Sequence, residues 1–175
     1  MTDGNAKSRL GGCIFCGYNS GAIFSFSRND TTVSSLSHSS TEAEIKALDL
    51  LIQEIVHFID ICKCLRIVTE NVCVPILIDN TSAITLCTTL RATHKTKTIN
   101  MRINYIREMV NARVISLHFV PSYKNVADIL TKPLVYIPYS GHRKVLLTGH
   151  GSVNPLLEYD VSNAIYHIDF VSDTV

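Results

Sequence analysis

The spacing of apolar side chains changes several times along the chain, and the first part has the pattern of strands. Residues 12–18 (G-C-I-F-C-G-Y) and 21–27 (G-A-I-F-S-F-S) have the composition of two short strands. Asn19, Ser20 and Gly21 lie between them and favour a tight turn. The chain is therefore predicted to open its fold with a β-hairpin.

Three later stretches are also predicted to be extended. Residues 31–36 show a weak strand pattern. Residues 72–79 (V-C-V-P-I-L-I-D) form a continuous apolar run, which is typical of a strand buried on both faces. Residues 114–120 predict a further strand.

The strongest helical pattern begins near residue 40. Two Ser/Thr-x-x-Glu boxes could cap its start, one formed by Ser39 with Glu42 and the other by Thr41 with Glu44. Apolar side chains then recur every three or four residues and form one stripe that can face a core. The members of this stripe are Ile45, Leu48, Ile52, Ile55, Ile59 and Cys62.

Shorter helices are predicted in the second half of the chain. They cover residues 80–90 and 96–111, and a short one covers 124–132 and ends at Pro133. The predicted order is β-β-β-α-β-α-α-β-α. This order is typical of an α/β domain with a mixed sheet.

Composition limits the class of protein. A chain of 175 residues, 46% of them hydrophobic, can form one domain with a sizeable core. A formal net charge of +1 means that any basic surface for nucleic acid must be local. No stretch approaches the roughly 18 apolar residues of a membrane helix, so no membrane partner is expected. The first residues contain no apolar signal core, and an intracellular, non-secreted chain with reduced thiols is therefore expected.

Six cysteines are present, and four of them form two close pairs. Cys13 and Cys16 lie in one apolar run, and Cys62 and Cys64 lie in another. Zinc knuckles place such pairs in glycine-flanked loops, whereas free cysteines inside apolar runs are usually core side chains. We therefore expect core thiols.

Three segments place carboxylates at the ends of different predicted elements. They are S-S-T-E-A-E at 39–44, I-L-I-D-N at 76–80 and V-A-D-I-L-T-K-P-L at 126–134. Acidic groups that reach one sheet edge from separate elements suit a two-metal phosphodiester-cleaving site. Mg²⁺ prefers oxygen ligands, so Asp and Glu are the expected residue types.

Four motifs in the same order resemble a known family. Between about residues 7 and 134 the chain is similar to the ribonuclease H domain that ends the polyprotein of copia-type LTR retrotransposons. The matching pieces are S-S-T-E-A-E-I-K-A-L (39–48), I-D-N-T-S-A-I (78–84), H-K-T-K-T-I-N-M-R-I-N-Y-I-R-E (94–108) and F-V-P-S-Y-K-N-V-A-D-I-L-T-K-P-L (119–134).

The resemblance implies a fold, an activity and partners. The expected fold is a ribonuclease H-like mixed sheet flanked by helices over residues 1–134, followed by an unassigned, poorly packed tail over 135–175. The expected activity is hydrolysis of the RNA strand of an RNA–DNA hybrid with Mg²⁺ or Mn²⁺. A reverse transcriptase domain would precede this one in the parent polyprotein. The expected location is a cytoplasmic virus-like particle or the nucleus.

The resemblance also implies four catalytic, metal-binding carboxylates, of which three can be placed. Asp79 and Asp128 match the family's second and last aspartates, although each could instead serve a helix start. Two residues compete for the glutamate. Glu44, with Ala47 three residues later, fits the spacing in relatives, whereas Glu42 fits the capping box better.

The fourth carboxylate has no clear counterpart. In the family it lies on a central strand before the hairpin, and counting back from Gly11 runs past Met1. The central strand is therefore expected to be largely missing, and Asp3 in T-D-G is a weak substitute. This departure leaves two hypotheses: an impaired hybrid ribonuclease, or a catalytically inactive remnant of the same fold that still binds nucleic acid.

A local group of basic residues is the expected nucleic-acid contact. Phosphate contacts by such a group would give sequence-independent, salt-sensitive binding. His118 is predicted to be a strand side chain and not a proton-transfer group. The proposed contact residues are Arg91, His94, Lys95, Lys97, Arg102 and Arg107.

Overall fold

The computed structural model describes residues 9–16, 20–29, 40–68, 72–89 and 96–150. Asp3, Arg91, His94 and Lys95 lie outside these residues, as does the predicted extended stretch 31–36. The elements are, in chain order, β1 (Arg9–Phe15), β2 (Ala22–Asn29), α1 (Ser40–Cys64), β3 (Val74–Ile78), α2 (Thr81–Thr88), α3 (Lys97–Asn111), β4 (Ile115–Phe119), the 3₁₀ turn η1 (Ser122–Lys124), α4 (Asp128–Thr131) and α5 (Tyr136–Thr148).

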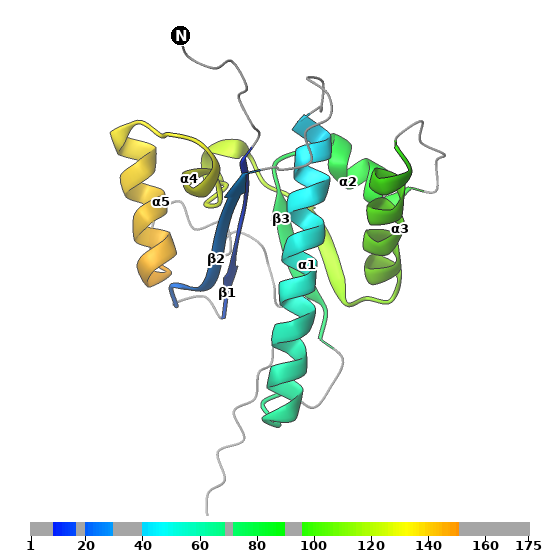
Figure 1. The fold of residues 1–175 in the computed structure, drawn as a ribbon. Helices are drawn as coiled ribbons and strands as arrows, with labels where there is room; N and C mark the ends of the chain where they lie inside the picture. Colours follow the sequence, from blue (N-terminus) through cyan, green and yellow to red (C-terminus); the bar gives the residue numbers. More distant parts are fainter. Residues whose placement is uncertain (1–8, 17–19, 30–39, 69–71, 90–95, 151–175) are drawn as a thin grey trace, which may run out of the picture.

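The described strands form two separate two-stranded sheets. β1 and β2 pair antiparallel, and β3 and β4 pair parallel. The predicted α/β class is confirmed. The strands do not join into one mixed sheet within the described residues, because no strand there is hydrogen-bonded to both β1 and β3. Figure 1 shows β1 and β2 to the left of the long helix α1, and β3 and β4 behind it.

Helix α1 carries the core. Its predicted apolar stripe is confirmed, since Ile45 and Ile52 are fully buried and Leu48 and Ile55 nearly so. Ile76 and Ile78 of β3 complete the same core, together with isoleucines of α3. The regular spacing of these side chains explains why 25 consecutive residues are helical. One helix therefore holds β3 and α3 in place on its inner side.

The β-hairpin is confirmed, with its first strand shifted toward the N-terminus. β1 runs from Arg9 to Phe15, and its register with β2 changes between Ile14 and Phe15. Gly11 lets the strand lie close to α4, because a side chain there would overlap that of Thr131. The hairpin is thus packed directly against the last predicted motif.

Part of the segment expected to be a poorly packed tail is a helix. α5 packs against β2, and its His142 and Val145 are almost fully buried. The helix ends at Thr148, and its C-cap Gly149 has a φ of 70° that favours glycine; a Cβ there would overlap the backbone of Ser20. The fold thus continues past residue 134.

Cysteine placement follows the sequence prediction in part. Cys62 and Cys87 are buried, and burial raises the pKa of the Cys13 thiol to about 12. Cys64 is exposed at the end of α1, so it is not a core thiol. Among the described helices, none is long and apolar enough to cross a membrane.

Candidate active site

Three of the predicted carboxylates come from three different elements. Glu44 lies in the second turn of α1, Asp79 directly follows β3, and Asp128 is the first residue of α4. β3 and β4 are parallel, so Asp79 and the chain that leads from β4 to α4 emerge at the same end of the pair. The topology therefore delivers Asp79 and Asp128 to one edge.

Electrostatic coupling shows that Glu44 lies near both aspartates. The pKa of Glu44 is raised to about 7, chiefly by burial. The negative charges of Asp79 and Asp128 raise this pKa as well, whereas the positive charge of Lys132 lowers it. A carboxyl group in a partly dry place beside two like charges resists ionisation. The site therefore concentrates negative charge that a cation could neutralise.

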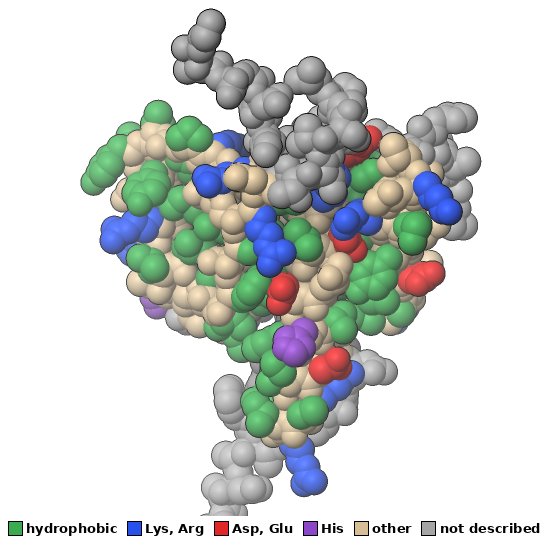
Figure 2. Space-filling view, in the orientation of Figure 1, with side chains coloured by type: hydrophobic (Ala, Val, Ile, Leu, Met, Phe, Trp, Pro, Cys, Tyr) green, Lys and Arg blue, Asp and Glu red, His purple; other side chains and the backbone are tan. Residues whose placement is uncertain are grey.

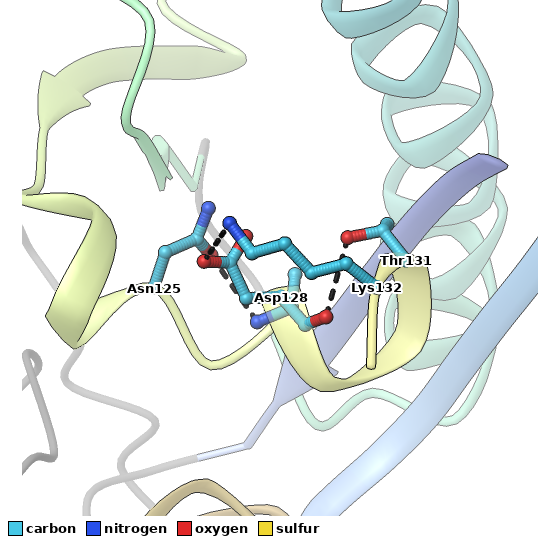
Figure 3. Close-up of polar contacts among 5 residues, drawn as sticks. Asn125, Asp128, Thr131 and Lys132 are labelled. Carbon is cyan, nitrogen blue, oxygen red and sulfur yellow. Dashed lines mark hydrogen bonds and ion pairs between the residues drawn. The ribbon is translucent and has the colours of Figure 1, made fainter. Parts of the chain in front are cut away.

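Asp128 is held by a local network at the start of α4 (Figure 3). Lys132 Nζ lies 2.6 Å from Asp128 Oδ2, one helical turn away. Thr131 Oγ1 donates to the Asp128 carbonyl at 3.2 Å, and the Ala127 N–H donates to Asn125 Oδ1 at 3.1 Å. The Lys132 ammonium thus lies beside this carboxylate, where a bound metal cation would otherwise lie.

Asn80, the residue after Asp79, caps helix α2. Its Oδ1 accepts a hydrogen bond from the Ala83 N–H at 3.0 Å, and its Nδ2 lies 3.5 Å from Thr41 Oγ1. The cap role that the sequence allowed for Asp79 therefore belongs to Asn80. Thr41 itself lies inside the first turn of α1 and not at its N-cap. This contact ties the start of α2 to the start of α1, beside Glu44.

His142 of α5 is a neighbour that the sequence did not predict. Its side chain is almost fully buried, and its Nδ1 has no hydrogen-bond partner among the described residues. Burial lowers its pKa, and the charge of Asp128 acts in the opposite direction. α5 therefore lies close to the carboxylates.

The neighbour Lys132 could have been predicted from the sequence, because it stands four residues after Asp128 in a predicted helix and such residues lie on the same face.

The alternative glutamate, Glu42, lies in the first turn of α1 and is about nine-tenths buried. Two residues along a helix correspond to a rotation of roughly 200°, so Glu42 and Glu44 leave opposite sides of α1. The pKa that the charges of Asp79 and Asp128 raise is that of Glu44.

Two of the proposed nucleic-acid contacts bind the protein itself. Arg102 forms an ion pair with the buried Asp49 of α1. Arg107 donates to the Leu86 carbonyl from Nε and Nη2, at 3.2 and 2.8 Å. Lys97 is exposed at the start of α3. His118 lies in β4 as predicted, with Nε2 2.9 Å from Ser116 Oγ.

Within the described part of the chain, no group of three or more His, Cys, Asp or Glu side chains is close enough together to hold a metal ion. The three carboxylates influence one another without forming a closed ligand set. No protein-family model matches the chain, and no solved structure matches it.

Proposed function

We propose that this chain is a ribonuclease H-like domain of the copia retrotransposon type that acts on RNA–DNA hybrids. The observation that carries the proposal is that Glu44, Asp79 and Asp128 come from three different elements, with Asp79 and the chain leading to Asp128 at the same end of the β3–β4 pair. Three carboxylates from three elements supply the hard oxygen donors that Mg²⁺ or Mn²⁺ requires. The order of the motifs along the chain supports the same family.

The chemistry follows from these side chains. Glu44, Asp79 and Asp128 would hold the divalent cation, which when bound would supply Lewis-acid activation of water and of the phosphodiester. Glu44 would have to lose its proton, and Asp128 would have to release the Lys132 ammonium. Lys97 on α3 would contribute a phosphate contact without base specificity. In the parent polyprotein a reverse transcriptase domain would produce the hybrid, in an intracellular particle or the nucleus.

A second function is supported by the ion pair at Asp128. With Lys132 in place, the site is already partly neutralised, and a ligand set of three carboxylates is not closed. The chain would then be a catalytically inactive domain that binds nucleic acid through its fold. Asp3, the weak candidate for a fourth carboxylate, lies outside the described residues.

Cleavage of a labelled RNA–DNA hybrid in Mg²⁺ and in Mn²⁺ decides between these functions. We expect wild-type cleavage, and we expect Asp79→Asn to abolish it while leaving the melting temperature nearly unchanged. Asp60→Asn is the matched control, because Asp60 is exposed near the far end of α1. No cleavage by folded wild-type protein that still binds the hybrid would support the inactive domain.

A further inference from the structure

The outer face of α5 exposes large apolar and aromatic side chains. Tyr136 is 81% and Ile137 is 82% exposed, and Val135, Tyr139 and Leu147 are exposed as well. The opposite face of the same helix is fixed, since His142 and Val145 are buried against the rest of the fold. The exposed side chains are therefore presented on a rigid support.

Along α5, two exposed tyrosines are followed by two exposed basic side chains. Tyr136 and Tyr139 are one turn apart, and Arg143 follows two turns after Tyr136. At about 1.5 Å rise per residue, these three side chains span roughly 10 Å on neighbouring positions of one face. Lys144 extends the basic end, and both Arg143 and Lys144 are exposed.

The charge of this region has one sign. Residues 129–150 contain Lys132, Arg143 and Lys144 but no Asp or Glu. Figure 2 shows hydrophobic side chains with basic ones beside them over α5, on the left of the view, and no acidic side chain among them there. A nucleic acid supplies the phosphates that are complementary to this basic charge.

The buried face of α5, not its outer face, is turned toward the candidate active site. Asp128 and Lys132 both influence the buried His142, which stands one residue before Arg143 on the same helix. Binding at the outer face is therefore independent of the proposed function.

We propose that the outer face of α5 is a binding site for single-stranded nucleic acid. The rings of Tyr136 and Tyr139 stack on bases, and Arg143 and Lys144 neutralise phosphates. Stacking on aromatic rings tolerates any base, and phosphate contacts are common to RNA and DNA. The site therefore takes single strands of either kind without sequence preference.

Fluorescence anisotropy of the full chain with labelled 12-nucleotide oligo-uridylate and oligo-thymidylate tests the stacking. We expect Tyr136→Ala and Tyr139→Ala each to weaken binding by at least about fivefold. Tyr136→Phe keeps the ring and is expected to retain the affinity. Ile137→Ala is the matched control, because it removes an equally exposed apolar side chain without a ring.

Salt dependence tests the phosphate contacts. We expect Arg143→Gln and Lys144→Gln each to reduce the slope of log affinity against log salt by about 0.7, the value for single strands. Lys63→Gln, at the exposed far end of α1, is expected to leave the slope unchanged.

Several outcomes would overturn the proposal. These are failure of the wild-type chain to bind either oligonucleotide, an equal loss in Ile137→Ala, or self-association that Tyr136→Ala abolishes. The last two would mark an apolar protein interface. Asp79→Asn separates this site from the proposed ribonuclease, because it is expected to retain oligonucleotide binding whether or not the wild-type chain cleaves hybrids.

Discussion

At the scale of single residues, Glu44 carries a pH dependence whose sign can be worked out. Its pKa is about 7 in the folded chain against an ordinary value of 4.5, so the unfolded state loses this proton at lower pH than the folded state does. Glu44 therefore lowers the free energy of unfolding as pH rises from about 4.5 to 7, by no more than about 3 kcal/mol. We expect Glu44→Gln to remove this decline in urea unfolding. An unchanged pH profile would contradict the raised pKa of Glu44 in the folded chain.

Lys132 and a divalent cation compete for Asp128. Removing the ammonium leaves the three carboxylates less neutralised, so a cation should bind more strongly. We expect Lys132→Gln to tighten Mn²⁺ binding several-fold in a titration followed by electron paramagnetic resonance. Lys132→Arg keeps the charge and should bind Mn²⁺ like the wild type. Equal affinities in all three proteins would show that the ion pair does not oppose metal binding.

The same residues show how much of the site a sequence can reveal. Asp79 and Asp128 could be selected because each ends or begins a predictable element. The choice between Glu42 and Glu44 depends on which side of α1 faces β3. The apolar stripe does not define the orientation of the helix finely enough to choose between these two residues. His142 gave no signal, because its neighbour Asp128 is distant in sequence and belongs to another helix.

At the scale of elements, α1 provides the stability of the half that contains β3 and α3. Ile52 is fully buried in the core that α1 forms with β3 and α3. Its truncation removes buried apolar surface and leaves a void, so Ile52→Ala should cost about 2–5 kcal/mol of unfolding free energy. Ile61→Ala, on the exposed part of the same helix, should cost much less in the same urea titration. Equal costs would contradict the packing.

Helices with a long apolar repeat were predictable, and elements without one were not. α1 and α3 bury residues at regular intervals of three or four positions. α5 buries mainly His142 and Val145 and contains Pro138 and Gly141, so its pattern does not stand out from a loop. β1 begins three residues earlier than predicted because Leu10 is buried there, while Arg9 remains exposed.

At the scale of the whole molecule, the element order predicted an α/β fold but not the division of the described strands into two sheets. Pairing between strands depends on contacts between residues far apart in sequence, which local periodicity does not contain. The hydrogen bonds of β3 show where the division lies. Val74 N–H donates to the Val114 carbonyl, and Val120 N–H donates to the Ile78 carbonyl. Because strand groups alternate, Val74, Ile76 and Ile78 face β4, whereas Pro75 and Leu77 face the opposite edge.

That opposite edge faces the side of β1, and no described strand pairs with it. Pro75 has no N–H, which suits an unpaired edge. Leu77 is therefore the residue of β3 whose backbone N–H points toward this edge. We expect the Leu77 amide to exchange with deuterium many-fold faster than the amides of Ile76 and Ile78, measured by NMR. Equal protection of all three would mean that another strand pairs with this edge and joins the two sheets into one.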